Sequence, residues 1–266
     1  MKYNTKYTKW IVLFGIALIV FFTIASILYN ANAGPYEAFE VEWLNRYQDP
    51  AAPKSATVTF NGVTYTGTYQ ETKDLLPKHY IEHTYRGDGY KFAINSDTGE
   101  VCEFGTFGHS KDTSTVDKSY CRQLADSIVD DYFELNEYLV KEECFENGEN
   151  YIMTYTYYKN FNGYQSADRF WIRINGNGEV VYFTRYGAGS FSDVKSVSVN
   201  KRKVKEAIKK ELETIYAGTT VPVENFQASD GLLVRLEDGS CAVFYEVGGI
   251  NQGILMFIVK VDYKIK

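Results

Sequence analysis

The strongest hydrophobic pattern in the chain is the run at residues 10–29, which holds no charged side chain. Lys2, Lys6 and Lys9 precede this run, and the first acidic residue is Glu37. A helix of this length rises about 30 Å, the thickness of a bilayer hydrocarbon core. Because basic flanks tend to stay in the cytoplasm, the pattern predicts a cytoplasmic tail at 1–9, a transmembrane helix at 10–30 and an extracellular C-terminal region.

A cleaved signal peptide is the alternative interpretation of this run. Ala31, Asn32 and Ala33 have the small-x-small pattern of a cleavage site that would cut after Ala33. The apolar stretch is longer than the roughly 7–15 residues of a signal peptide, which favours a retained single-pass anchor in the cell membrane. Both interpretations place residues 34–266 outside the cytoplasm.

Beyond residue 34, apolar and polar residues alternate in short runs, as in strands with one buried face. Phe170, Ile172 and Ile174 share one side of such a strand, and Trp171 and Arg173 share the other. Asn-Gly and Asp-Gly pairs stand between several of these runs and suit tight hairpin turns. We therefore expect hairpins at 56–69, 91–104 and 169–186, and a strand at 255–263.

Three segments carry apolar residues at helical spacing. Two of them lie at 116–135 and 204–215, and Asp117 and Asn200 are their plausible N-caps. A third pattern starts at Pro35 and predicts a short juxtamembrane helix with aromatic residues on one face, namely Tyr36, Phe39, Trp43 and Tyr47.

The predicted elements repeat along the chain. Gly99-Glu100-Val101 and Gly178-Glu179-Val180 occupy the same hairpin position, and each of the last two repeats begins with a helix. The predicted fold class is therefore α+β, with the transmembrane helix followed by tandem units in which a helix covers an antiparallel sheet. The units span residues 34–110, 111–190 and 191–266, and the first is rich in strands.

Two segments resemble the PepSY superfamily, which is named for its occurrence in peptidase propeptides. They are KFAINSDTGEVCEF at 91–104 and YTYYKNFNGYQSADRFWIRINGNGEVVYF at 155–183. The resemblance implies a cystatin-like fold with a helix packed on a sheet. It also implies a role in binding or restraining peptidases, or in binding peptides at the cell surface.

Charge limits the classes of partner. Without the three lysines of the predicted tail, the exterior region has 25 basic residues against 34 acidic ones. This acidic balance argues against nucleic acid or an anionic lipid surface as the main partner.

The four cysteines are Cys102, Cys121, Cys144 and Cys241, and none forms a C-x-x-C pair. Four half-buried thiols are the plain interpretation, but an extracellular compartment allows disulfides. The first candidate bridge is Cys102–Cys121, because it would join the end of one unit to the next helix.

No motif for catalysis, a cofactor or a metal stands out. The histidines His79, His83 and His109 lie in the first unit, and histidines four apart on a strand are too far apart to ligate one metal ion. The glycine-rich stretch at 175–178 is a hairpin turn rather than a phosphate loop. We expect no enzyme, no cofactor and no metal site.

Four aromatic residues are candidates for a binding face. Tyr151, Tyr155 and Tyr157 fall on one side of a strand, and Trp171 follows on the next strand. Aromatic side chains on a sheet can hold a sugar or a peptide. The tyrosines can equally form the core beneath the helix that starts near Asp117, and this second interpretation is favoured.

Together these patterns predict a non-catalytic extracytoplasmic module on a bacterial cell surface, which binds a peptide, a peptidase or another envelope component and can restrain a protease. One alternative is an accessory or sensory subunit of a membrane complex. Another is a cell-envelope hydrolase with an unrecognised site.

Overall fold

The computed structural model describes residues 36–42, 44–76, 80–107, 117–147, 150–187, 189–220, 223–249 and 253–266. These residues form two α-helices, α2 (Lys118–Asp130) and α3 (Lys201–Ile215), and two short 3₁₀ helices, η2 (Leu135–Glu137) and η3 (Val223–Asn225). The rest of the regular structure is β-strand: β1 (Ala38–Glu40), β2 (Leu44–Tyr47), β3 (Ser55–Phe60), β4 (Val63–Leu75), β5 (Tyr80–Arg86), β6 (Tyr90–Asn95), β7 (Val101–Thr106), β8 (Leu139–Asn147), β9 (Asn150–Phe161), β10 (Tyr164–Asn175), β11 (Val180–Tyr186), β12 (Val194–Ser198), β13 (Gln227–Ala228), β14 (Leu232–Arg235), β15 (Cys241–Gly249) and β16 (Gly253–Ile265).

Asn-Gly turns close the predicted hairpin at 56–69 and a further hairpin between β9 and β10. Asn61 and Gly62 have φ of 48° and 76°, and Asn162 and Gly163 have φ of 52° and 85°. Positive φ at both central residues is the signature of a type I′ turn, whose twist matches that of the flanking strands. Predicted strands are confirmed in β3, β4, β6, β7, β10, β11 and β16.

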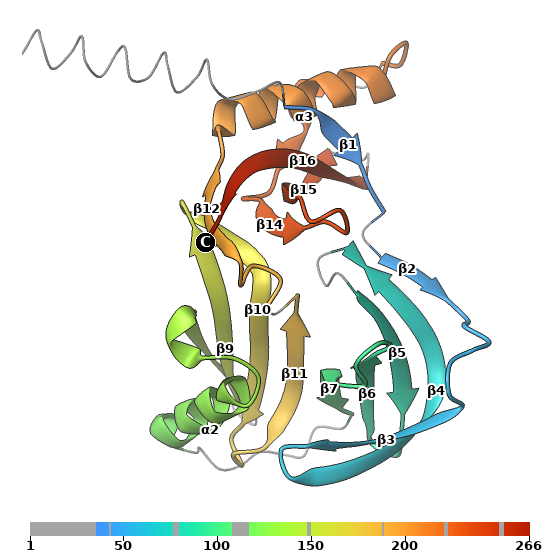
Figure 1. Ribbon diagram of the computed structural model, residues 1–266, viewed down its shortest axis with the longest axis vertical. Coiled ribbons are helices and arrows are strands. Elements are labelled where there is room, and N and C mark those ends of the chain that lie inside the picture. The colour runs from blue at the N-terminus through green and yellow to red at the C-terminus, as the bar shows by residue number, and fades with distance from the viewer. Residues whose placement is uncertain are drawn as a thin grey trace, which may run out of the picture.

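The strands form one continuous mixed sheet (Figure 1), whose main order is β1-β16-β15-β14-β10-β11-β7-β6-β5-β4-β2. We call β2 to β11 the large half of this sheet and β1 with β13 to β16 the small half. The halves meet where β10 pairs in parallel with β14, at Ser166 and Leu233. Within the large half, β7 pairs antiparallel with β11 and so joins the first predicted unit to the second.

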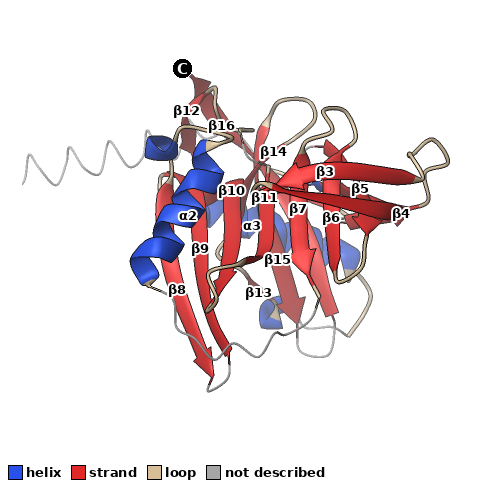
Figure 2. Cartoon of the chain, turned by 90° about the horizontal axis from the view of Figure 1, so that it is seen from below, coloured by secondary structure: helices blue, strands red, loops and turns tan. Residues whose placement is uncertain are grey.

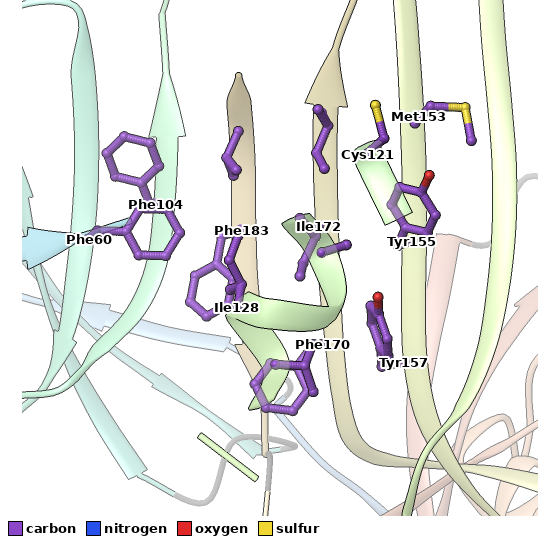
Figure 3. Packing of buried hydrophobic residues seen from close by; sticks show 14 of the residues in the cluster. Phe60, Phe104, Cys121, Ile128, Met153, Tyr155, Tyr157, Phe170, Ile172 and Phe183 are labelled. Atoms are coloured by element: carbon purple, nitrogen blue, oxygen red, sulfur yellow. The ribbon is translucent and has the colours of Figure 1, made fainter. Parts of the chain in front are cut away.

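One face of the large half is closed by α2. Buried side chains of the helix, among them Cys121 and Ile128, pack on the alternate residues of β9, β10 and β11 that point toward it (Figure 3). Phe170, Ile172 and Ile174 are fully buried there, as the alternation predicted. The helix begins at the predicted N-cap, since the Asp117 carboxylate accepts a hydrogen bond from the Ser119 amide.

The first part of the chain covers the same face with a hairpin instead of a helix. The first half of β4 pairs with β3, and the second half pairs with β5. The β3–β4 hairpin places Phe60 with its ring 4.8 Å from that of Phe104 and 4.9 Å from that of Phe183. The hairpin and α2 therefore close one shared core (Figure 3).

The second helix covers the small half. Buried residues of α3, including Val204, Ile208 and Leu212, pack with alternate residues of β15 and β16 such as Val243, and these make a second core. The predicted N-cap is confirmed, because the Asn200 side chain accepts a hydrogen bond from the Lys203 amide. Figure 2 shows α2 in front of the strands and α3 behind them.

The predicted fold class is wrong in its central statement. The described residues are mostly strand, and the predicted tandem units share one sheet instead of each forming a separate helix-covered one. A separate unit would leave the backbone groups at the edges of β7, β10, β11 and β14 unpaired, and pairing between units satisfies them. Each predicted unit contributes strands to this sheet, and the boundaries at 110 and 190 stay predictions.

The N-terminal predictions have two different outcomes. The juxtamembrane helix is wrong, because β1 pairs with β16 and β2 pairs with β4. This segment thus joins the small half to the large half. A short isolated helix is marginally stable, and the backbone hydrogen bonds formed at two sheet edges stabilise the strands instead. The predicted span at 10–30 lies outside the described residues. Among the helices within the described ranges, none is long and apolar enough to cross a bilayer.

Candidate functional site

The large half of the sheet has a second face, which no helix covers among the described residues. The strand register brings Trp171 of β10 opposite Thr184 of β11, and Thr184 opposite Glu103 of β7. These residues alternate with the core residues and therefore point away from α2. We call this surface, together with the corresponding side of the small half, the helix-free face.

Aromatic and arginine side chains stack along this face. The Trp171 and Tyr182 rings meet edge to face with centroids 5.4 Å apart. The Arg173 guanidinium lies 4.3 Å from the centre of the Trp171 ring, and that of Arg169 lies 4.7 Å from the centre of the Tyr186 ring. Such cation–π contacts hold flat, rigid surfaces in place, and rigid surfaces lose little entropy when they bind a ligand.

Three adjoining cavities follow the helix-free face. The central one, which we call the aromatic cavity, has a volume of about 450 Å³ and is lined by Leu75, Glu103, Glu143, Thr156, Arg169, Trp171, Tyr182, Thr184 and Tyr186. Because residues from β4 and from β8 line the same cavity, the sheet curves around it. Burial raises the pKa of the Tyr182 and Tyr186 hydroxyls, so both stay protonated at neutral pH.

The second cavity, the acidic cavity, shares Leu75 with the first. Its volume is about 730 Å³, and it lies between β2, β4 and β5 on one side and the β14–β15 turn on the other. Its lining includes the apolar side chains of Leu76 and Leu236. Among the described residues, five carboxylates and no basic side chain line it: Glu42, Asp74, Asp97, Glu237 and Asp238. A hydrogen bond from Lys260 holds the pKa of the Asp238 carboxyl far below its usual range, so this carboxylate stays charged.

The third cavity, the Lys201 cavity, shares Arg169 with the first. Its volume is about 440 Å³, and residues of β10, β14 and β15 line it. Lys201 begins α3 and lines this cavity, whose other walls include Leu232, Phe244, Asp230 and Glu246. Neighbouring cavities thus share a lining residue, and we refer to the three together as the helix-free groove.

An apolar cluster joins the two halves beside the groove. Val234, Phe244 and Ile258 of the small half are buried there, and Tyr186 and Leu76 of the large half pack against them. Since these contacts hold both halves in a set arrangement, the groove is formed before any ligand binds.

Charged groups on the groove floor are mostly neutralised by neighbours. Glu103 is buried and forms ion pairs with Lys91 at 2.5 Å and Lys73 at 3.4 Å. Glu143 pairs with Lys141 at 2.9 Å. Both carboxylates that line the aromatic cavity are therefore compensated by lysines of the protein itself.

A second buried polar cluster has a structural role. Asp168 is fully buried and accepts hydrogen bonds from the Tyr138 hydroxyl at 2.6 Å and from the amides of Gly189 and Phe191 at 2.9 and 3.2 Å. Lys159 lies 3.5 Å away. The cluster fixes the connection from β11 to β12 and leaves the Asp168 oxygens committed to protein donors.

The predicted binding-face aromatics separate into two groups. Tyr151, Tyr155 and Tyr157 lie in the core under α2, with exposures of 7%, 0% and 0%, so they offer no surface to a ligand. Trp171 alone of the four lies in the groove. The prediction missed Arg169, Tyr182 and Tyr186. The alternation that set Trp171 and Arg173 apart from Phe170 contained a signal for Arg169, but not for its neighbours on β11.

The predicted Cys102–Cys121 bridge is not formed. Both side chains are buried thiols, Cys102 in β7 and Cys121 in α2, where burial raises the pKa of the Cys121 thiol. Cys144 and Cys241 are thiols as well.

The histidines offer no metal centre within the described ranges. His83 is buried and its Nδ1 shares a hydrogen bond of 3.0 Å with the Thr72 hydroxyl, while His79 and His109 lie outside those ranges. Across the residues that are described, no three His, Cys, Asp or Glu side chains gather in a way that could hold a metal ion.

Comparison with known proteins gives one loose structural likeness. No protein family profile and no curated protein matches the chain. A solved structure, the C-terminal domain of YpeB from Bacillus megaterium, matches over 91% of this chain and 94% of that chain, with 11% sequence identity and a TM-score of 0.33. The likeness to the PepSY superfamily therefore rests on the two sequence segments, and the function is argued from this chain's own residues.

Proposed function

We propose that this chain is a non-catalytic module that binds an extended polypeptide along the helix-free groove. The observation that carries the proposal is the succession of three cavities, of which the aromatic cavity shares Leu75 with one neighbour and Arg169 with the other. A track of this kind suits a linear chain better than a compact small molecule, which favours one enclosed pocket.

The lining of the groove matches the chemistry of a polypeptide. Trp171, Tyr182 and Tyr186 offer broad surfaces for apolar side chains. The five carboxylates of the acidic cavity attract lysine or arginine side chains, in keeping with the net charge of −6 of the whole protein. The favoured ligand is therefore a peptide segment with basic and aromatic residues.

The sequence motifs extend this proposal to the kind of partner. A free peptide, a segment of a peptidase or a segment of another envelope protein would each present such a chain. Occupation of the groove by a peptidase segment would restrain that peptidase, because a bound segment is withheld from its own active site.

Tryptophan fluorescence tests the proposal directly. The chain has three tryptophans, so a full-length variant with Trp10→Phe and Trp43→Phe retains Trp171 as its only reporter. A peptide rich in lysine and phenylalanine is expected to shift the Trp171 emission in a saturable way. An emission unchanged across a panel of basic, acidic and neutral peptides would refute the proposal.

A matched pair of variants locates the binding site. Tyr182→Ala removes an aromatic wall of the groove and is expected to weaken binding about tenfold, the effect of losing one good aromatic contact. Tyr120→Ala removes a side chain that is 51% exposed on α2 and is expected to leave affinity unchanged. Equal loss in both variants would place the site elsewhere.

Location at the membrane stays a separate prediction, because it depends on residues 10–30. Fractionation of cells, with protease added from outside, distinguishes a retained anchor from a secreted form cut after Ala33. Replacement of residues 10–29 by an unrelated hydrophobic helix tests the accessory-subunit alternative, which requires partners to be lost with the native segment.

A further inference from the structure

Arg169 is the residue at which the groove changes from one half of the sheet to the other. It belongs to β10, the strand that both halves share, and it lines the aromatic cavity and the Lys201 cavity. Any chain that follows the groove past Tyr186 must meet its guanidinium.

The guanidinium of Arg169 is compensated only by neutral groups. It lies over the Tyr186 ring at 4.7 Å and hydrogen-bonds to the hydroxyl of that tyrosine. Within the part of the chain that the structure describes, it forms no ion pair with a carboxylate. Burial lowers the pKa of Arg169, because removal from water disfavours the charged guanidinium. A bound anion would repay that cost.

Arg185, on the opposite face of the same sheet, shows how the charge of a buried arginine is ordinarily compensated. It is buried, stacks over the Tyr132 ring at 5.0 Å, and donates to the Glu100 carboxylate at 2.6 Å. In the described part of the chain, a carboxylate therefore pairs with the arginine under the helix and none pairs with the arginine in the groove.

Lys201 adds a second cation on the same side. Its ammonium lies 5.0 Å from the centre of the Tyr164 ring and, across the described residues, forms no ion pair. Arg169 and Lys201 line one cavity of about 440 Å³, which is large enough for the last residue of a peptide. An arginine fork suits a planar carboxylate, because two N–H groups can donate to its two oxygens.

The remaining walls distinguish a peptide end from a simple anion. Asp230 and Glu246 line the Lys201 cavity and would repel a phosphate or sulfate ion. A peptide terminus carries N–H groups next to its carboxylate, and these can donate to Asp230 or Glu246 while the carboxylate meets Arg169.

We propose that Arg169, with Lys201 beside it, binds the C-terminal carboxylate of the polypeptide, so that the ligand runs from basic residues in the acidic cavity to a free C-terminus in the Lys201 cavity. This inference rests on the proposed function and states in which direction the bound polypeptide runs along the groove. The ligand class is a peptide with a basic N-terminal part, an aromatic centre and an unblocked C-terminus.

Three synthetic peptides of about ten residues, which extend over about 33 Å, test the direction. The first has lysines at its N-terminal end, aromatic residues in the centre and a free carboxylate. The second is the same peptide with a C-terminal amide, and the third has the sequence reversed. With the full-length protein, we expect amidation to weaken binding about 10- to 100-fold, the range for a lost hydrogen bond to a charged group. Reversal is expected to weaken binding to a similar degree.

Variants assign the effect to the residues. Arg169→Gln is expected to abolish the difference between the free acid and the amide, and Lys201→Gln, at an exposed site, is expected to reduce it. Arg202→Gln is the matched control, since Arg202 lies next to Lys201 on α3 but pairs with Glu206. Circular dichroism checks that each variant is folded. If Arg169→Gln does not fold, Lys201→Gln still tests the assignment.

The outcomes separate the two proposals. Equal binding of the free acid and the amide overturns the carboxylate assignment and leaves the peptide groove in place. Binding of none of the peptides overturns both proposals. Displacement of the bound peptide by inorganic phosphate at a concentration similar to that of the peptide would show a general anion site and would also overturn the assignment.

Discussion

The two faces of β10 are built from neighbouring residues and have opposite uses. Phe170, Ile172 and Ile174 are fully buried under α2, whereas Arg169 and Trp171 are half-buried in a groove. The backbone is the same for both sets, so the difference arises from what covers each face. A helix and a hairpin close one face into a core, and the small half of the sheet borders the other without filling it.

The two faces also differ in how their charged side chains are paired. On the covered face, Arg185 is matched by Glu100. On the helix-free face, the buried carboxylate Glu103 is matched by two lysines, while among the described residues Arg169 is paired with the Tyr186 ring and hydroxyl and with no carboxylate. Internal pairing indicates a structural role, and an arginine that lacks such pairing indicates a position kept for a ligand.

The largest effect is expected from breaking the covered face. Phe170→Ala removes a fully buried ring that packs against Tyr132, Tyr138 and Phe183. The free energy of unfolding should fall by about 3–5 kcal/mol, as for other buried phenylalanines. Urea denaturation measures the loss. Trp171→Ala, one residue away on the other face, should cost less stability and should weaken peptide binding, and a loss equal to that of Phe170→Ala would contradict the contrast.

A smaller loss of stability is expected at the connection between the halves. Asp168→Asn removes the charge that accepts hydrogen bonds from Tyr138, Gly189 and Phe191 and lies near Lys159. The free energy of unfolding should fall by about 2–3 kcal/mol, because hydrogen bonds to a charged group are the stronger ones. Hydrogen exchange at the Gly189 and Phe191 amides should rise in this variant. Unchanged exchange there would argue against the structural role of Asp168.

The contributions of α2 and α3 to stability can be compared through their N-caps. Asp117→Ala in α2 and Asn200→Ala in α3 each remove a side chain that accepts a hydrogen bond from the first turn. Each should lower the free energy of unfolding by about 1 kcal/mol. Thermal unfolding followed by circular dichroism checks both variants. Peptide binding should survive in both, since neither cap lines the groove.

The smallest effect concerns the Arg185–Glu100 pair. The hydrogen bond from Arg185 lowers the pKa of Glu100 below its value in the unfolded chain, despite the opposing effect of burial. The pair therefore contributes stability above the unfolded pKa of about 4.3, and this contribution is lost as pH falls through the folded pKa. In thermal melts between about pH 6 and 2, the native protein should lose more stability on acidification than Glu100→Gln. If the stability of both proteins falls in parallel as the pH falls, the Arg185–Glu100 pair does not contribute to the loss.

The alternation of residues was enough to predict many local features. It separated Phe170 from Trp171 and located the hairpins, because these depend on neighbours in sequence and on the φ angles of Asn-Gly turns. Helix spacing likewise predicted α2 and α3 with their caps. The same approach failed for the helix predicted from Pro35 onward, because residues 38–40 and 44–47 form two strands that pair with distant edges.

The sequence by itself determined the two long helices with their caps, several hairpins, and which side of β10 is apolar, since these are local consequences of propensity and period. Only the tertiary structure decided that the predicted units share one sheet, that Tyr155 is core while Trp171 lines a groove, and that Arg169 and Lys201 line one cavity. Those outcomes depend on pairing between edges far apart in the chain, such as β7 with β11 and β10 with β14. Such pairing is driven by the need to satisfy backbone hydrogen bonds, and the backbone carries no residue-specific signal in the sequence.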